Sequence, residues 1–424
     1  MRLRPTTRGW GLAFAGVAVM LVGVFLGAVD LVRIGSLALL LVVGAAIGVG
    51  LLDPGRGRHR LSIMRSTTPN PVHAGEEALV DVVITATDQA ARVRLAGLRF
   101  AEQAATELSA GRPLRARVAR SAQRVTVSYT VQAARRGRWP LGPLVVTRTD
   151  PFGVARTTAT LGEPAEVIVW PAVVPLPTPS DVLVGEPDRV ALGARTPSTD
   201  DASLRDYREG DDLRRVHWSS SARRGALMVR SDERAGMRPV SVLLDLPART
   251  TALEWSISLA ASMALAMLDA GHPVRLVGGA APEVPTGSAV ARRSPVGFVH
   301  ARTGPAVRAA LLDRTVDLEA PRTSEQADAE LVAAAHLLET TDAGGEIVLA
   351  VLGPLGGTAR AALAHVADTA QGWAVVRAEG PNPAQQREAE HTVHALHRAG
   401  WRACVVVPGE DIVACWLRLL GSVR

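Results

Sequence analysis

Two uncharged, apolar runs lie next to each other near the start of the chain, and they limit its architecture more than any other feature. The first run covers residues 10–29 and the second covers residues 34–52, with Asp30 and Arg33 in the tight break between them. Each run is close to the roughly 20 residues that a helix needs to cross a bilayer. The pattern predicts a transmembrane helical hairpin over residues 9–52.

Two other interpretations of these runs stay open at this point. A secretory signal peptide would share the basic start, but the first run is long, lacks a clear A-x-A cleavage site and is followed at once by a second run. A hairpin buried in a soluble core would show polar residues at regular spacing, and neither run does. In a membrane hairpin, glycines four residues apart would let the helices pack closely: Gly23 with Gly27, and Gly44 with Gly48.

Arginines flank the hairpin at its two outer ends. The tail over residues 1–8 and the segment after the second run carry Arg2, Arg4, Arg8, Arg56, Arg58, Arg60 and Arg65. In the connection, Asp30 balances Arg33. Because positively charged flanks stay on the cytoplasmic side, we expect a two-span protein of the cell membrane with both termini in the cytoplasm.

The hydrophobic period changes to two in the next segment, residues 60–175. Apolar side chains alternate with their neighbours in two stretches, at Val80, Val82 and Ile84 and at Val125, Val127, Tyr129 and Val131. This alternation predicts half-buried antiparallel strands. Turn signals separate the strands, so we expect a small β-sandwich of immunoglobulin-like character. The sequence Asp-Pro-Phe-Gly at residues 150–153 is expected to be a turn whose Phe152 fills the core.

Strands and helices alternate in the last segment, residues 237–424. The apolar run at residues 240–246 is typical of a buried parallel strand. Further strands are expected at residues 274–277, 346–352, 373–376 and 403–407, and helices at residues 305–316, 324–340, 358–369, 384–399 and 411–420. This alternation predicts a doubly wound parallel α/β sheet.

Residues 176–236 connect these two parts, first as a linker rich in proline and glycine and then as the densest charged stretch of the chain. That stretch, residues 203–230, also contains Tyr207 and Trp218, which a purely solvated charge run would not need. Apolar residues three apart predict two short amphipathic turns, followed by a strand over residues 226–231. We expect the aromatic side chains to face inward and part of the charge to face outward.

This charged stretch resembles the motif of the domain of unknown function 58 (DUF 58) family, approximately R-x-Y-x-x-G-D-D-x-R-x-I-x-W-x-x-x-A-R. The residues that fit are Arg205, Tyr207, Gly210, Asp211, Asp212, Arg214, Trp218, Ala222 and Arg223, and Val216 replaces the isoleucine. Residues 135–155 are similar to a second segment of that family, with Trp139 and Val154 as departures. The resemblance implies a membrane anchor, a von Willebrand factor type A-like domain, and work beside MoxR-type AAA+ ATPases and other membrane proteins.

The expected α/β domain lacks part of the metal-binding motif of type A domains. Type A domains that bind a metal carry D-x-S-x-S after their first strand, where an aspartate and two hydroxyls hold a divalent cation. Here Asp245 matches, but Pro247 and Arg249 replace both hydroxyls. We therefore expect no metal and no cofactor, and we interpret Asp245 as a helix cap or an ion-pair partner.

Other candidate sites have simpler explanations. A P-loop needs a lysine, and the chain has none. The serines at residues 219–221 beside His217 fit a helix turn better than a catalytic triad. His391, His394 and His397 share one helical face and fit an exposed polar stripe better than a metal site. Cys404 and Cys415 are expected to be reduced and buried.

These observations favour binding over catalysis, as in a membrane-anchored adaptor or assembly factor. One alternative is an enzyme of unknown type that uses Asp245 or the carboxylates of the charged stretch. A second is a membrane protein that binds nucleic acid, because the net charge is +6. The arginines are mixed with acidic residues, and only 4% of the residues are aromatic and available to stack on bases, so we expect no nucleic-acid partner.

Overall fold

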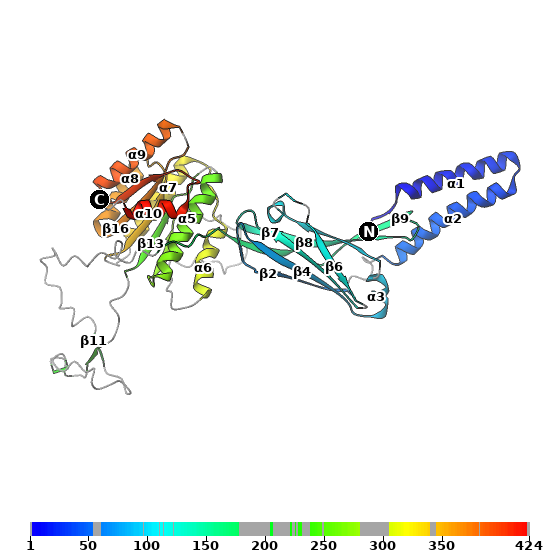
Figure 1. Ribbon diagram of the computed structural model, residues 1–424, viewed down its shortest axis with the longest axis horizontal. Helices are drawn as coiled ribbons and strands as arrows, with labels where there is room; N and C mark the ends of the chain where they lie inside the picture. The colour runs from blue at the N-terminus through cyan, green and yellow to red at the C-terminus, as the bar shows by residue number, and fades with distance from the viewer. Residues whose placement is uncertain are drawn as a thin grey trace. The chain divides into compact units, whose positions relative to one another are not determined.

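The computed structural model describes residues 2–53, 61–95, 97–109, 111–112, 114–121, 123–177, 204–206, 221–222, 225, 228–230, 238–247, 250–279, 305–339, 345–380 and 382–421. The chain forms two compact units, Met1–Ala172 and Val173–Arg424, which are described one after the other (Figure 1).

The first unit begins with the two apolar helices, α1 (Thr7–Leu26) and α2 (Val29–Leu51), and both are long and apolar enough to cross a membrane. They pack closely at glycines, because a Cβ added to Gly35 would lie 2.5 Å from the Gly16 carbonyl oxygen. Gly23 also lies in this contact, as predicted. The prediction was wrong for Gly27, Gly44 and Gly48, where an added Cβ would meet no atom within 4 Å.

Two β-sheets make up the rest of this unit. The first sheet has the order β2 (Leu61–Thr68), β4 (Glu77–Ala86), β7 (Arg124–Gln132) and β6 (Ala116–Arg120). The second has the order β1 (Arg2–Pro5), β9 (Ala155–Leu161), β8 (Gly137–Thr149), β10 (Ala165–Trp170) and β3 (Val72–His73), and β5 (Arg99–Ala104) also pairs with β8. A short helix, α3 (Gln89–Leu95), and a 3-10 turn, Thr106–Leu108, connect strands.

The two sheets share one apolar core, to which each contributes alternate side chains. The predicted inward-facing residues of β4 and β7, from Val80 to Ile84 and from Val125 to Val131, are buried in it. Leu141, Leu144 and Val146 of β8 face them from the second sheet. The period-two pattern therefore predicted these strands correctly, because one face of each strand lies in the core.

Two local predictions in this unit were wrong. Residues 2–5, expected to be part of a tail, form β1 and pair with β9 in antiparallel register. Phe152, expected to fill the core, is 62% exposed. Asp150 is buried in its place, because its carboxylate accepts hydrogen bonds from the amides of Phe152 and Ala155 at 2.8 and 2.6 Å and closes the turn.

The second unit is built on a parallel sheet, as predicted. Its strand order is β14 (Val274–Val277), β13 (Val240–Leu244), β15 (Ile347–Leu352), β16 (Gln371–Arg377) and β17 (Arg402–Val406). The helices are α5 (Thr250–Asp269), α6 (Pro305–Val316), α7 (Ser324–Glu339), α8 (Gly357–Thr369), α9 (Pro383–Arg398) and α10 (Ile412–Gly421). Residues 204–206 and 228–230 pair as the short strands β11 (Leu204–Asp206) and β12 (Met228–Arg230).

Helices cover both faces of this parallel sheet (Figure 1). Helices α7, α8 and α9 pack on one face, and α5 and α10 pack on the other. Helix α5 is also apolar enough to qualify as a membrane span by composition, but 89% of its apolar window is buried in this unit. Its apolar character is therefore explained by the core of the α/β unit.

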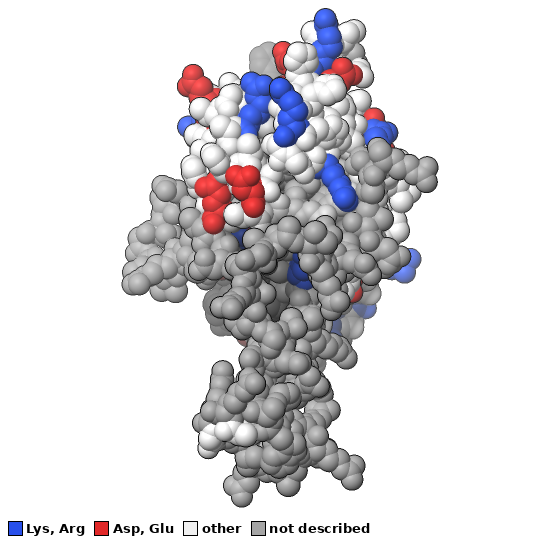
Figure 2. All heavy atoms as spheres, turned by 90° about the vertical axis from the view of Figure 1, so that its left-hand side faces the viewer, with Lys and Arg blue, Asp and Glu red and all other residues white. Residues whose placement is uncertain are grey.

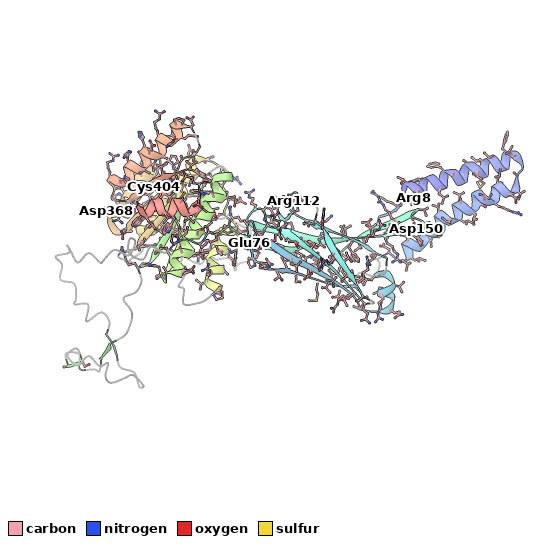
Figure 3. All side chains as sticks on the ribbon, viewed as in Figure 1. Arg8, Glu76, Arg112, Asp150, Asp368 and Cys404 are labelled. Atoms are coloured by element: carbon pink, nitrogen blue, oxygen red, sulfur yellow. The ribbon has the colours of Figure 1, made fainter. Side chains whose placement is uncertain are left out.

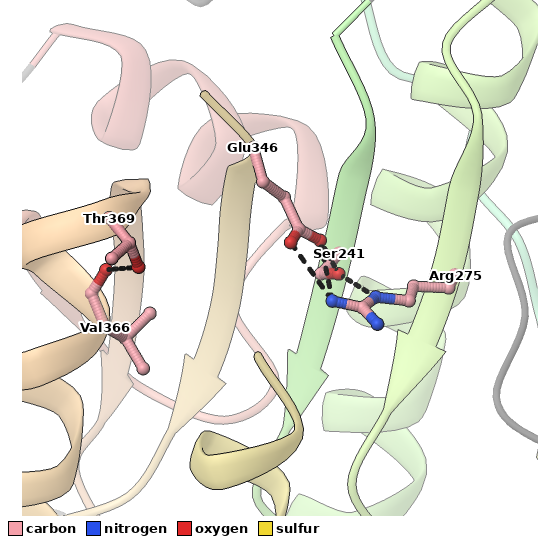
Figure 4. A network of polar contacts seen from close by, with 5 residues as sticks. All are labelled: Ser241, Arg275, Glu346, Val366 and Thr369. Atoms are coloured by element: carbon pink, nitrogen blue, oxygen red, sulfur yellow. Dashed lines mark hydrogen bonds and ion pairs between the residues drawn. The ribbon is translucent and has the colours of Figure 1, made fainter. Parts of the chain in front are cut away.

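A buried polar network ties three neighbouring strands together at their amino ends (Figure 4). Arg275, the second residue of β14, donates from Nη2 to both carboxylate oxygens of Glu346 at 3.1 and 3.0 Å. Ser241, the second residue of β13, contacts both side chains. All three residues are buried. The charges of Arg275 and Glu346 therefore compensate each other within the sheet.

Candidate functional site at the carboxyl edge of the parallel sheet

The strand order defines where a ligand would bind. Numbered along the chain, the five strands lie in the order 2-1-3-4-5, and the order reverses between β13 and β15. In such sheets, ligands bind outside the carboxyl ends of the strands, at the point of reversal. Asp245 follows β13 at this point, Gly353 follows β15, and Arg377 ends β16.

These three residues form one closed group. The Arg377 guanidinium donates from Nη2 to Asp245 Oδ2 at 2.9 Å and from Nη1 to the Asp245 carbonyl oxygen at 2.6 Å. The Gly353 amide donates to the same carboxylate oxygen at 2.7 Å. A Cβ at position 353 would lie 2.8 Å from Arg377 Nη2, so only glycine lets the backbone approach this closely. The ion pair agrees with one of the two roles predicted for Asp245.

A second carboxyl group lies nearby, on α7. Burial and the negative charge of Asp245 raise the pKa of Asp328. Its carboxylate lies beside Gly356, because a Cβ added to Gly356 would be 2.8 Å from Asp328 Oδ2. The edge of the sheet therefore combines two carboxyl groups with one buried guanidinium.

Sequence reasoning identified Asp245 but missed Arg377 and Asp328. A signal for Arg377 was available, because it is a charged residue that directly follows the apolar run of residues 373–376, at the position where a parallel strand reaches its functional edge. No comparable signal marks Asp328, which is one of several acidic residues on a polar helix.

The residues at this edge do not fit a divalent cation. The Asp245 carboxylate already binds a guanidinium, which carries the charge that a cation would supply. Pro247 is buried and its side chain has no ligand atom, and Arg249 lies outside the described residues. Within the described ranges, no group of three or more His, Cys, Asp or Glu residues is placed to hold a metal ion.

A polar cleft with a volume of about 540 Å³ opens next to this edge, between the loop after β15 and α9. Gly356 is the N-cap residue of α8 there, and the buried Thr392 accepts a hydrogen bond from the Leu355 amide at 3.1 Å. The charged groups of its rim are Arg360, Arg387 and Glu388, and His391 lies beside them. Figure 2 shows basic and acidic groups interspersed on one face of the molecule. The cleft is basic overall and suits an acidic group.

Most of the DUF 58-like residues lie outside the described residues, namely Tyr207, Gly210, Asp211, Asp212, Arg214, Trp218 and Arg223. The backbone of Arg205 is described and pairs with Val229 across β11 and β12. The strand β12 falls within the strand predicted over residues 226–231. The inward orientation of the aromatic residues stays a prediction.

The two cysteines are free and buried, as predicted, with Cys404 in β17 and Cys415 in α10. Burial raises the pKa of Cys404 to about 11. Burial, together with the hydrogen bond to Glu410, raises the pKa of Cys415 to about 12. Both thiols are therefore protonated near neutral pH and are poor nucleophiles.

Comparison with known proteins bears on the charged stretch and on the start of the α/β unit. The model of the family described as "Protein of unknown function DUF58" matches residues 203–287. The match supports the DUF58 family. The segment contains both the DUF58-like motif and Asp245, so it joins the charged stretch to the first strand of the parallel sheet.

The other comparisons add little to the DUF58 match. A search of the curated proteins found no match. Among solved structures, the chain is similar to the PilB minor pilin from Streptococcus sanguinis, with 9% identity, a TM-score of 0.29, and 72% of this chain and 82% of that chain covered. An aspartate-to-alanine mutant of that pilin gives the same identity and TM-score, with 85% and 76% covered. Likeness at this level carries no argument about fold or function.

Proposed function

We propose that the chain is a membrane-anchored binding protein and not an enzyme. The observation that carries this proposal is the closed group at the carboxyl edge of the parallel sheet. Asp245 stands where an active type A domain would present its metal-binding aspartate, and Arg377 and Gly353 hold its carboxylate. A carboxylate held in this way is poorly suited to bind a catalytic metal or to accept a proton from a substrate.

We also propose a specific fold for the parallel-sheet unit and for the two-sheet unit. The parallel sheet, with helices on both faces and Asp245 at the end of its first strand, supports a von Willebrand A-like domain. The two sheets that share one core support an immunoglobulin-like sandwich. The two apolar helices anchor the chain in the cell membrane, and the arginine flanks support a cytoplasmic position for both termini.

We propose that the chain binds a protein partner. The DUF58 resemblance supports a MoxR-type AAA+ ATPase together with other membrane proteins. The basic rim of the cleft beside Gly356 supports contact with an acidic segment, because Arg360 and Arg387 are both exposed there. Nucleic acid is not assigned as a partner, because acidic residues accompany the arginines along the chain.

Crosslinking in native membranes followed by mass spectrometry tests this function. We expect the wild-type chain to capture an AAA+ ATPase, and we expect the double variant Arg360→Glu/Arg387→Glu to lose it. Arg308→Glu is the matched control, because Arg308 is an exposed arginine on α6. Equal capture by the cleft variant and the wild type would refute the cleft as the binding surface, and capture of no protein partner by the wild type would refute the adaptor function.

A further inference from the structure

Arginines gather on one exposed face of the second sheet, where β1 leads into α1. Arg4 lies directly opposite Arg156 across the β1–β9 ladder. One step along the same face, Thr158 of β9 pairs with Thr147 of β8, which pairs in turn with Arg99 of β5. Residues paired across an antiparallel ladder, and residues two apart along a strand, share a face of the sheet. Arg4, Arg99 and Arg156 are exposed, so this face carries a cluster of positive charge.

No carboxylate of the described ranges lies within ion-pair distance of any of these arginines. Like charges placed directly opposite each other destabilise a strand pair. Arg4 and Arg156 are also far apart in the chain, so the fold brings them together. A negatively charged partner would relieve this repulsion.

The same end of the unit carries a turn that is tied to the start of α1. The Thr6 hydroxyl donates to the Gly153 carbonyl oxygen at 2.5 Å, and the Thr6 amide donates to the Val154 carbonyl oxygen at 2.9 Å. Arg8 follows in the first turn of α1, where a Cβ added to Gly153 would lie 3.8 Å from Arg8 Nη1. Figure 3 labels Arg8 and Asp150 at this end of the sandwich, and Glu76 and Arg112 at the other end. Phe152, at the tip of the turn, is 62% exposed. An exposed phenylalanine beside the first turn of a membrane helix can bury its ring at the boundary between headgroups and acyl chains.

An apolar cleft opens next to this turn, between the first half of α1 and the last half of α2. Its volume is about 570 Å³, within the range of roughly 300–1,000 Å³ that small-molecule sites occupy. Its walls include Gly9, Trp10 and Ala13 of α1, Val43 and Ile47 of α2, and Val154. The cleft carries no charged side chain on its walls, so it suits a hydrocarbon chain.

We propose that the arginine face binds the headgroup phosphates of anionic phospholipids in the cytoplasmic leaflet. Pro5, which lines the apolar cleft, directly follows Arg4 in β1, so the cleft and the arginine face lie on opposite faces of the β1–β9 ladder. Arg4, Arg156 and the neighbouring Arg8 meet phosphate groups, the cleft holds an acyl chain, and Phe152 inserts between lipids. This site rests on the proposed membrane-spanning role of α1 and α2. It goes beyond the charge bias that orients membrane helices, because Arg156 belongs to a strand of the sandwich and is far from the hairpin in sequence.

Native mass spectrometry of the full chain in detergent, titrated with short-chain phosphatidylglycerol or phosphatidylcholine, tests the proposal. We expect phosphatidylglycerol to bind more tightly, and we expect Arg4→Gln/Arg156→Gln to weaken its binding on the order of twentyfold, since each arginine near an anionic surface contributes roughly fivefold. Arg4→Lys/Arg156→Lys should restore binding, because it keeps the charge. The preference should shrink in high salt, since the screening length falls from about 8 Å at 0.15 M to about 3 Å at 1 M.

Arg112→Gln/Arg117→Gln is the matched control, because these exposed arginines belong to the same unit and are absent from the arginine face. Equal binding of the two lipids, or an equal loss in this control variant, would overturn the lipid site. Carbonate extraction of native membranes separates this outcome from failure of the anchor. A chain that the extraction releases refutes the membrane span and this site with it, whereas a retained chain without headgroup preference refutes the lipid site alone.

Discussion

Replacing Arg377 with methionine tests whether the closed group at the carboxyl edge stabilises the α/β unit. The Arg377 side chain is 2% exposed, and the side chain of its partner Asp245 is 10% exposed. Methionine fills similar space but donates no hydrogen bond, so the variant keeps the Asp245 carboxylate buried without its cation. Removing one member of a buried ion pair costs about 3–5 kcal/mol, and we expect a loss of that size.

Hydrogen exchange of the β13, β15 and β16 amides in the full chain measures this loss. A local measurement is needed because the chain has two compact units, and a single unfolding free energy is then poorly defined. Asp245→Asn/Arg377→Met should recover part of the stability, because neither charge is left unpaired. Arg308→Met is the control, because Arg308 and Asp269 are 45% and 55% exposed and such a pair contributes about 0–1 kcal/mol. A loss below about 1 kcal/mol for Arg377→Met, or a double variant no more stable than the single one, would refute the reasoning.

Four further predictions follow from the sequence and the two units. A reporter fused after residue 424 should be cytoplasmic and one inserted between Asp30 and Arg33 external; a periplasmic C-terminus would contradict the arginine argument. Millimolar Mg²⁺ or Mn²⁺ should not change the melting temperature of the purified chain, and a saturable rise would show a bound cation. Cys404 and Cys415 should resist alkylation near neutral pH until the chain is denatured, because their pKa values are raised to about 11 and 12; rapid labelling of the folded chain would show that they are accessible. Trp218→Ala should lower the free energy of opening of the α/β unit, measured by hydrogen exchange, by about 3–5 kcal/mol, the cost of emptying a buried aromatic site, and unchanged exchange would show that Trp218 is not packed.

The strands and helices could be predicted closely because their signals are local. The strand at residues 274–277 and the helix at residues 305–316 were predicted with the bounds that the structure has. The strand lies between a glycine–proline stop at residues 271–273 and the glycines at residues 278–279, and these local signals define it without knowledge of its neighbours. The same holds for β7, where the alternation from Val125 to Val131 reports a face that is buried along its length.

The contacts between distant segments could not be predicted in this way. Residues 2–5 are too few for their alternation to indicate a strand, and their partner β9 lies about 150 residues further along the chain. Phe152 shows a related limit, because hydrophobicity predicts burial only where the backbone can turn the side chain inward. The Asp150 carboxylate binds two amides of its own turn, and this geometry leaves Phe152 exposed at the tip.

The two buried arginines of the parallel sheet suggest a rule that would have found both ion pairs. Arg275 is the second residue of its strand and Arg377 is the last residue of its strand. Parallel strands place their like ends at the same edge, so a charge near the start of one strand can pair only with residues near the starts of its neighbours. Glu346 directly precedes β15, and Asp245 directly follows β13, and these are the partners in the structure. Because an unpaired buried charge is too costly to keep, the strand order and the position of each arginine together specify its partner.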